Sequence, residues 1–168
     1  MPGPLHPADC TIIIRMETPE FKTVGIVGAG AMGRGIAQIA AQAGSKVLLF
    51  DTQADAVAKA RESVAAQWDK LVEKGRIDAA AAAAQKERVQ PAATLADLAP
   101  CDLIVEAIVE RLDVKKGLFA ELEGIVQTTA VLATNTSSLS VTAIAAGLKR
   151  PQQFAGFHFF NPVPLMKV

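Results

Sequence analysis

The chain has 168 residues, a length that predicts one domain with a single sizeable hydrophobic core. Its 17 basic residues balance its 17 acidic residues, so its net charge gives no general attraction to nucleic acid or to an anionic membrane. Apolar residues make up 51% of the sequence and aromatic residues only 5%, which favours aliphatic packing between strands and helices, and no apolar run reaches membrane-spanning length.

The first 21 residues contain four of the nine prolines and precede the first convincing strand. We therefore expect residues 1–21 to be a flexible leader and residues 22–168 to form the folded domain. Ile12–Ile14 could form an edge strand, and Met16 could be the first translated residue.

The stretch from Thr23 to Asp51 predicts a strand, a turn, a helix and a second strand. Val24–Val27 is an apolar run rich in β-branched residues, typical of a strand buried on both faces. Ile36–Ala41 has helical spacing, and Val47–Phe50 is a second strand-like run that ends at Asp51. The glycines of this unit follow the pattern GxGxxG at Gly28, Gly30 and Gly33.

This pattern and its context predict a dinucleotide-binding turn. Gly28 would let the chain turn off the strand, Gly30 would let a pyrophosphate approach the backbone, and Gly33 would let the helix pack closely on the sheet. Asp51, 23 residues after Gly28, would accept hydrogen bonds from ribose hydroxyls and repel a 2′-phosphate, so we expect NAD rather than NADP. The alternative is a tight β–α turn with an aspartate that caps the next helix.

After Asp51 the sequence predicts an inserted helical hairpin. Its first helix spans Ala54–Lys74, and its second begins at Asp78, which has N-cap character before six alanines. The basic residues Lys70, Lys74 and Arg76 are interpreted either as ordinary solvated surface or as a ligand site.

The remaining sequence alternates strands and helices. We expect strands at Val89–Ala93, Asp102–Ala107 and Val131–Thr134, and a helix at Leu112–Val126 whose buried stripe is formed by Val114, Leu118, Phe119 and Leu122. This alternation predicts an α/β fold with a doubly wound, parallel, Rossmann-type sheet. Ligands of such sheets bind at the carboxyl ends of the strands. That edge would bring together Gly28–Gly33, Asp51, Ala107–Glu110 and Asn135–Ser138.

Two further segments carry candidate chemistry. Asn135–Ser138 lies between a predicted strand and a helix at Leu139–Ala146, where Ser or Thr is an ordinary N-cap. His158 lies among four phenylalanines at the end of a predicted strand. A histidine in such surroundings is commonly a core residue, but beside a nicotinamide it could take the proton of a hydroxyl group. Cys10 and Cys101 are isolated, which fits reduced thiols in a cytoplasmic protein and predicts no metal site.

Four segments together resemble the L-3-hydroxyacyl-CoA dehydrogenase family, which includes 3-hydroxybutyryl-CoA dehydrogenases. They are GAGAMGRGIA, VEAIVERLDVKKGLF, ATNTSSLS and GFHFFNPVPLMKV, and the resemblance extends from Thr23 to Val168. It implies oxidation of the 3-hydroxyl of an acyl-CoA with NAD, or the reverse, and a homodimeric full-length protein in the cytoplasm. The acyl chain length stays open.

The resemblance also implies roles for individual residues. His158 would be the general base, and Ser137 would bind the 3-oxygen of the substrate and the nicotinamide. Glu110 and Lys115 would contact the ribose side of the cofactor and the CoA side, respectively. The implied cofactor-binding residues are Gly28, Ala29, Gly30, Ala31, Met32, Gly33, Asp51, Glu110, Lys115, Ser137 and Asn161. The implied CoA-binding residues are Lys74, Lys115 and Ser137; the hairpin serine of the family is replaced by Gln67 or displaced.

The chain departs from the family pattern at its last residues. The glutamate that orients the histidine would follow Met166–Val168, and the all-helical second domain of the family is absent from this sequence. We therefore expect NAD binding with little turnover, because a carboxylate partner fixes the tautomer of a catalytic histidine. The alternatives are a non-catalytic, crystallin-like relative and a 3-hydroxyisobutyrate-type dehydrogenase, which would leave the HFFNP segment unexplained.

Overall fold

The computed structural model describes residues 20–53 and 55–166. The predicted strand at Ile12–Ile14 and most of the predicted leader lie outside these residues. The strands are β1 (Thr23–Val27), β2 (Lys46–Phe50), β3 (Val89–Pro91), β4 (Leu103–Glu106), β5 (Val131–Thr134) and β6 (Phe154–Gly156). The helices are α1 (Ala31–Gln42), α2 (Ala56–Glu73), α3 (Ala79–Arg88), α4 (Leu112–Ile125) and α5 (Val141–Ala145), with short 3₁₀ turns at Leu95–Leu98 and Pro151–Gln153.

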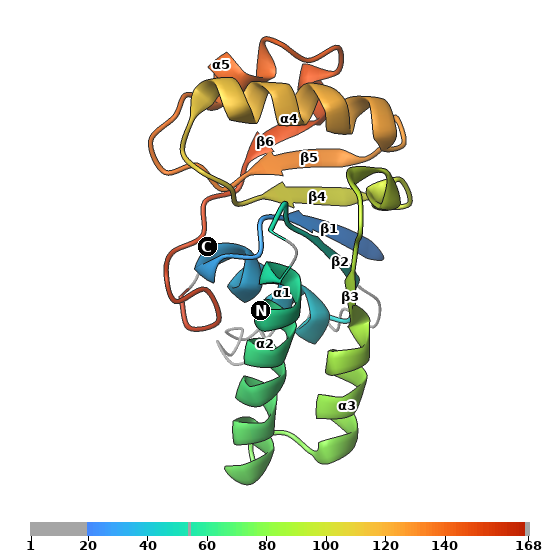
Figure 1. Cartoon of the computed structure of the whole chain (residues 1–168), viewed down its shortest axis with the longest axis vertical. Coiled ribbons are helices and arrows are strands. Elements are labelled where there is room, and N and C mark those ends of the chain that lie inside the picture. Colours follow the sequence, from blue (N-terminus) through green and yellow to red (C-terminus); the bar gives the residue numbers. More distant parts are fainter. Residues whose placement is uncertain (1–19, 54, 167–168) are drawn as a thin grey trace, which may run out of the picture.

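The six strands form one sheet in the order β3-β2-β1-β4-β5-β6, and every neighbouring pair is parallel (Figure 1). Strands β2 and β3 lie on one side of the central strand β1, and β4, β5 and β6 lie on its other side. The chain therefore crosses from one half of the sheet to the other between β3 and β4. This order is that of the doubly wound dinucleotide-binding fold, so the predicted fold class is confirmed.

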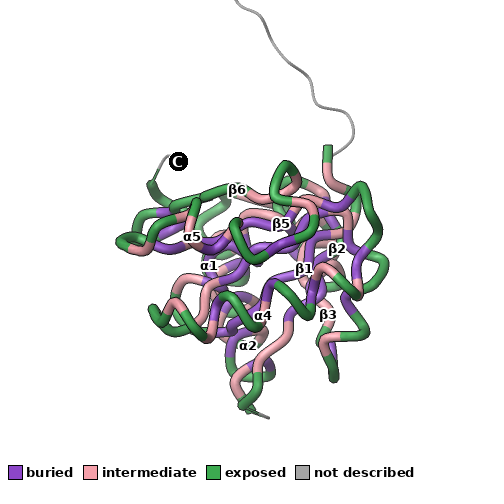
Figure 2. Tube along the Cα trace, turned by 90° about the horizontal axis from the view of Figure 1, so that it is seen from above, coloured by how far each residue is buried: buried purple, intermediate pink, exposed green. Residues whose placement is uncertain are grey.

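Helices cover both faces of the sheet. α1, α2 and α3 lie on one side, and α4 and α5 lie on the other (Figure 1). Ile26 and Leu49 pack toward the first group, whereas Ile104 packs toward Phe119 and Leu122 of α4. Buried residues accordingly run through the middle of the molecule, with exposed residues at its margins (Figure 2). The apolar runs of the central strands are buried because both of their faces are covered.

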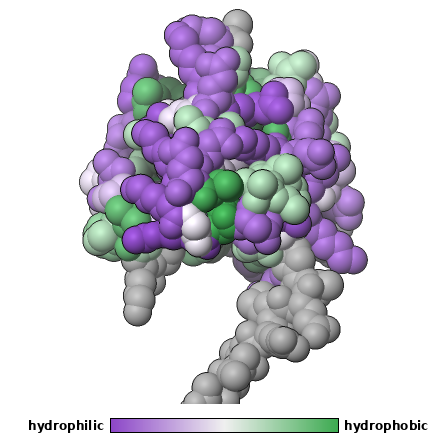
Figure 3. Space-filling view, turned by 90° about the horizontal axis from the view of Figure 1, so that it is seen from below, coloured by the Kyte–Doolittle hydropathy of each residue, from purple (hydrophilic) through white to green (hydrophobic). Residues whose placement is uncertain are grey.

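The α2–α3 hairpin projects from the body of the domain. Its inner side is anchored by Trp68, which is 1% exposed, while its outer end presents mostly hydrophilic residues (Figure 3). The carboxylate of Asp78 accepts a hydrogen bond of 2.6 Å from the Ala81 amide, which confirms the predicted N-cap. Gly75 has a φ of +63° just after α2, so a glycine ends this helix.

Helix α4 differs from its predicted buried stripe. Phe119 and Leu122 are completely buried, but Val114 and Leu118 are only partly buried. Lys115, one turn before Phe119 on the same face of the helix, is 1% exposed. Its burial requires a partner for the ammonium group, and that partner lies at the carboxyl end of β4.

The folded part includes Phe21, which lies within the predicted leader. Phe21 packs against the core, and its carbonyl accepts a hydrogen bond of 2.7 Å from the Ser45 hydroxyl. Among the described residues, no helix combines the length and the hydropathy needed to cross a membrane.

Candidate functional site

The glycine-rich turn connects β1 to α1 at the carboxyl edge of the sheet. Gly28 has a φ of +105°, and a Cβ at this position would lie 2.5 Å from the carbonyl oxygen of Ala107. A Cβ at Gly33 would lie only 1.7 Å from the carbonyl oxygen of Gly28. The turn therefore requires glycine at both positions, for backbone conformation at the first and for close packing of α1 at the second.

Gly30 differs from the other two glycines because the space that its Cβ would occupy is open, with no atom within 4 Å. Gly30 is the N-cap of α1, so the first amides of the helix lack acceptors inside the helix. An open approach to helix amides at the positive end of the dipole suits a pyrophosphate. The turn thus fits the dinucleotide that the sequence predicts.

Asp51 at the end of β2 lies beside this turn. One carboxylate oxygen accepts a hydrogen bond of 2.7 Å from the Ala29 amide, and the other accepts one of 2.8 Å from the Gln53 amide. These bonds fix the carboxylate at the rim, and the residue is only partly buried. Its free acceptor positions can take ribose hydroxyl groups, as predicted for NAD.

On the other side of β1, Glu110 connects the loop after β4 to the loop after β5. One carboxylate oxygen accepts hydrogen bonds from the Thr136 hydroxyl, from the Ser137 amide at 3.0 Å and from the Ser138 amide at 3.2 Å. Its partial burial acts to raise the pKa, but the hydrogen bonds from Thr136 and Lys115 outweigh burial and lower the pKa of Glu110 to about 2. Glu110 is therefore ionised at neutral pH and holds the Ser137 loop in place.

Behind Glu110 lies a buried ion pair. The Lys115 ammonium donates to Glu106 at 2.6 Å and lies 3.2 Å from Glu110. Glu106, with a side chain that is 0% exposed, also accepts hydrogen bonds of 2.7 Å from the Thr134 hydroxyl and of 2.7 Å from the Ile108 amide. Every partner of Glu106 donates, which is the pattern that an ionised carboxylate requires.

The segment after β6 brings His158 to the same edge. The Phe159 amide donates a hydrogen bond of 2.8 Å to the side chain of Asn135, which follows β5. The buried Phe159 ring anchors the segment, while His158 is exposed and packs at a ring-centroid distance of 4.8 Å from Phe160. Among the described residues, no carboxylate oxygen lies within 4.0 Å of a His158 ring nitrogen.

A cavity of about 360 Å³ joins these elements. Five residues for which the resemblance implies a role in binding or catalysis line it together: Met32, Glu110, Ser137, His158 and Asn161. Asn135 also contributes to the wall. The glycine-rich turn, the Ser137 loop and the His158 segment therefore meet in one place, although they are far apart in the sequence.

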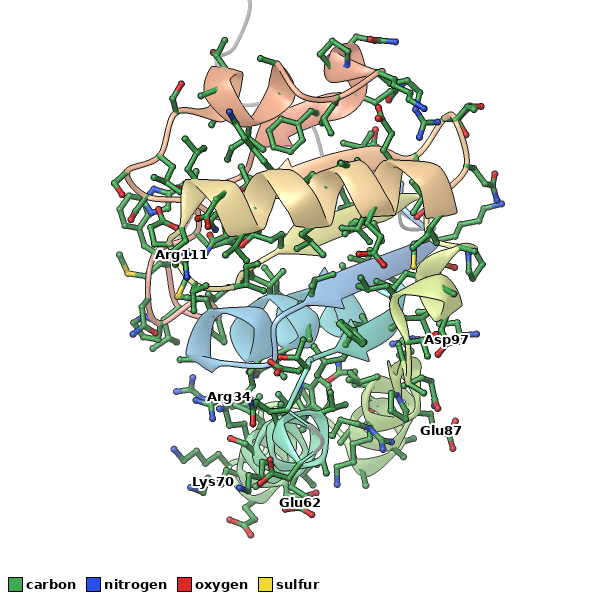
Figure 4. The ribbon with its side chains drawn as sticks, turned by 45° about the horizontal axis from the view of Figure 1, so that its top comes forward. Arg34, Glu62, Lys70, Glu87, Asp97 and Arg111 are labelled. Atoms are coloured by element: carbon green, nitrogen blue, oxygen red, sulfur yellow. The ribbon has the colours of Figure 1, made fainter. Side chains whose placement is uncertain are left out.

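A second cavity of about 460 Å³ lies between α1, the hairpin and the segment that follows His158. Arg34, Lys70, Lys74 and Arg76 line it, and none of its described lining residues is acidic. Figure 4 shows Arg34 and Lys70 on the same side of the molecule. Asn161 lines both cavities, so the basic cavity adjoins the His158 cavity.

Lys115 is the predicted site residue whose position differs most from the expectation. Its ammonium faces Glu106 and Glu110 instead of solvent, so a contact with CoA would require this buried pair to separate. Sequence reasoning missed the positioning roles of Glu106, Thr136 and Asn135. For Glu106 the sequence did offer a signal, because an acidic residue at the end of the apolar run of β4 indicates a buried carboxylate that needs a partner.

The strand order, the glycine-rich turn and the aspartate after β2 define a dinucleotide-binding α/β domain. Residues 23–168 match the family model described as "3-hydroxyacyl-CoA dehydrogenase, NAD binding domain". The chain belongs to this family, which makes NAD its cofactor.

Curated and solved relatives agree with this assignment. The chain is 44% identical over 147 residues to a 3-hydroxyadipyl-CoA dehydrogenase of Escherichia coli, covering 88% of this chain and 31% of the relative. It is 42% identical over 148 residues to a 3-hydroxybutyryl-CoA dehydrogenase of Bradyrhizobium diazoefficiens, covering 88% and 50%. A crystal structure of (S)-3-hydroxybutyryl-CoA dehydrogenase from Ralstonia eutropha superposes with a TM-score of 0.83 at 41% identity, covering 87% of this chain and 52% of that one. The chain thus spans half or less of the length of these curated relatives.

Proposed function

We propose that this chain is the cofactor-binding part of an oxidoreductase that interconverts (S)-3-hydroxyacyl-CoA and 3-oxoacyl-CoA. The observation that supports this proposal best is the cavity shared by Met32, Glu110, Ser137, His158 and Asn161. It places a histidine and a serine next to the turn that fits a dinucleotide. A purely structural protein of the same fold would need neither side chain there.

In the proposed reaction, His158 acts as the general base. It removes the proton of the 3-hydroxyl and becomes an imidazolium, while the carbon–oxygen bond becomes a carbonyl. The Ser137 hydroxyl would donate a hydrogen bond to the same oxygen and orient it. Bound NAD⁺ supplies the acceptor for the hydride that leaves the 3-carbon.

The basic cavity supports a CoA thioester as the substrate class. CoA carries several phosphate charges, and four cations from α1 and the hairpin line a cavity that adjoins the His158 site. We assign the phosphates of CoA to Lys74 and its neighbours Lys70 and Arg76. Lys115, in contrast, would act on bound ligands through Glu110, because its ammonium is enclosed by two glutamates.

We also propose that the chain by itself turns over slowly. The described residues provide no carboxylate beside His158 to fix its tautomer and to stabilise its charged form. Loss of such a carboxylate costs a catalytic histidine several orders of magnitude in rate. The expected behaviour is NAD binding with turnover far below that of a typical dehydrogenase.

The test is NADH binding and oxidation by the 168-residue chain with acetoacetyl-CoA, beside His158→Ala and the exposed control Gln152→Ala. We expect NADH to bind to all three proteins, and any slow oxidation to vanish only in His158→Ala. Oxidation at a normal dehydrogenase rate would refute the slow-turnover proposal. Oxidation that survives in His158→Ala would refute the role of His158.

A second experiment separates the substrate classes. In the presence of NADH, acetoacetyl-CoA should protect the hairpin from limited proteolysis, and Lys74→Ala should weaken this protection. Protection by free 3-hydroxyisobutyrate, and not by the CoA thioester, would favour a 3-hydroxyisobutyrate-type dehydrogenase instead. Protection by neither ligand in any length of the protein would favour a non-catalytic, crystallin-like relative.

The resemblance to the family leads to two further proposals: that the full-length protein is a homodimer, and that it is cytoplasmic. Light scattering on the full-length protein tests the first, and fractionation of the cells that produce it tests the second. A monomer at micromolar concentration would contradict the first.

A further inference from the structure

The cluster of Glu106, Lys115 and Glu110 contains two carboxylates and a single ammonium. Lys115 lies 2.6 Å from Glu106 and 3.2 Å from Glu110, so one ammonium neutralises only one of the two. The cluster therefore has one net negative charge. Glu106 and Lys115 are enclosed, with side chains 0% and 1% exposed, whereas the Glu110 side chain is 36% exposed, so water screens the charge of the cluster only through Glu110.

This charge lies at the edge of the cavity that holds His158. Glu110 lines that cavity together with Ser137 and His158, whereas Glu106 and Lys115 lie one layer behind it. Glu106 is also fixed by the Thr134 hydroxyl and the Ile108 amide, so the cluster is rigid. A rigid charge that solvent screens only in part, next to a ligand cavity, changes the affinity for ligands that differ in charge.

We propose that the net charge of the Glu106–Lys115–Glu110 cluster raises the affinity of the site for the oxidised cofactor relative to the reduced one, with Glu106 contributing its charge from behind the cavity. NAD⁺ has a positive pyridinium ring, and NADH lacks that charge. The net negative charge of the cluster attracts the pyridinium ring of NAD⁺ but does not attract the uncharged ring of NADH. The proposal rests on the cofactor-binding function proposed above and deepens it.

The charge of the cluster can be changed in steps with little change in shape. Glu106→Gln makes the cluster neutral, and Lys115 keeps Glu110 as its partner. The double variant Glu106→Gln/Lys115→Met removes one negative and one positive charge and restores the net charge of the wild type. Glu123→Gln is the matched control, because Glu123 is also a largely buried carboxylate on the domain, 7% exposed and bonded to the Arg150 amide at 2.6 Å. It lies eight residues beyond Lys115 on α4, about 12 Å along the helix.

The experiment is isothermal titration calorimetry of each protein with NAD⁺ and with NADH, after circular dichroism has shown that each is folded. In Glu106→Gln, the ratio of the NAD⁺ Kd to the NADH Kd should rise on the order of fivefold, as expected when one partly screened charge near the cavity is lost. The ratio should return to the wild-type value in the double variant and stay unchanged in Glu123→Gln. A purely structural role of Glu106 would weaken both ligands equally and would not be rescued by a second substitution.

The possible failures are distinguishable. A folded wild-type chain that binds neither form of the cofactor would overturn the proposed function. A wild-type chain that binds both forms, with the same ratio in Glu106→Gln, would overturn the electrostatic proposal and leave the function standing. A ratio that changes in Glu106→Gln but stays changed in the double variant would also overturn it, because net charge would not be the cause.

Discussion

Alanine at the three positions Gly30, Gly33 and Gly117 should separate folding from cofactor binding. At Gly33 the added Cβ would lie 1.7 Å from the carbonyl oxygen of Gly28, whereas real Cβ atoms stay beyond 3.0 Å of such atoms. The turn or α1 must then move by more than 1 Å, and Gly28 already has a φ of +105° that limits its adjustment. Overpacking of this kind costs about 3 kcal/mol, and the better helix propensity of alanine returns about 1 kcal/mol. We expect a net loss of about 2 kcal/mol.

Gly30→Ala should behave in the opposite way. No atom lies within 4 Å of the added Cβ, so the free energy of unfolding should change by less than about 1 kcal/mol, the cost of a poorer N-cap. The methyl group would instead occupy the space through which a pyrophosphate approaches the first amides of α1. We expect the affinity for NADH to fall at least about tenfold.

Gly117→Ala is the control, because Gly117 lies within α4 with no atom within 4 Å of its Cβ position. It should stabilise the domain by up to about 1 kcal/mol and leave NADH binding unchanged. Urea unfolding gives the stabilities, and NADH fluorescence gives the affinities. Equal stability of Gly33→Ala and Gly30→Ala, or full NADH affinity in Gly30→Ala, would refute the assignment of these roles to the turn.

Three further predictions follow from single carboxylates. Asp51→Asn keeps an acceptor for the Ala29 amide but removes the charge that repels a 2′-phosphate. The affinity for NADPH should therefore rise at least about fivefold relative to the affinity for NADH. An unchanged preference between the two nucleotides would contradict the role of Asp51. The pKa of Glu110 is lowered to about 2 from 4.5, so its carboxylate stabilises the fold fully above pH 4.5 and loses this effect as the pH falls toward 2. Glu110→Gln should thus be about 1 kcal/mol less stable than the wild type at pH 6, a small loss because solvent screens this partly exposed group. In urea unfolding, the difference in stability should shrink below about pH 4. A difference that does not depend on pH would contradict this prediction. Asp78→Ala removes the cap on the Ala81 amide and should cost about 1 kcal/mol of stability, whereas an unchanged urea midpoint would show that α3 does not depend on this cap.

The fold could be predicted because its local signals agree. Apolar runs of β-branched residues alternate with helical segments, and parallel sheets are the arrangement that buries such runs on both faces. The glycine spacing with Asp51 then located the turn. The last helix was predicted at Leu139–Ala146 but spans Val141–Ala145, because the Thr136 hydroxyl binds the Leu139 amide and Ser140 caps the helix.

The buried ion pair could have been predicted in part. Lys115 lies four residues before Phe119 and seven before Leu122, which puts it on the buried face of α4, and Glu106 ends an apolar strand. A charge in each of two buried positions suggests a pair. What the sequence does not show is that Glu110 shares the same ammonium, since that depends on the path of the loop between β4 and α4.

The path of the His158 segment also depends on tertiary contacts. Its amide–side chain bond from Phe159 to Asn135 spans 24 residues, and the buried Phe159 ring fixes which aromatic faces inward. The alternation of inward and outward side chains along the sequence does not show which of the four phenylalanines anchors the His158 segment in the core. The sequence predicted only that His158 follows a strand, and the cavity that it lines with Met32 agrees with that position.

The measurement that tests the central claim most directly is calorimetric titration of the folded 168-residue chain with NADH and, separately, with NADPH. The account predicts saturable binding of one NADH per chain and clearly weaker binding of NADPH, because Asp51 lies where a 2′-phosphate would have to fit. A chain that is folded by circular dichroism and binds neither nucleotide would contradict the assignment of the glycine-rich turn as a dinucleotide site, and with it every functional proposal made here.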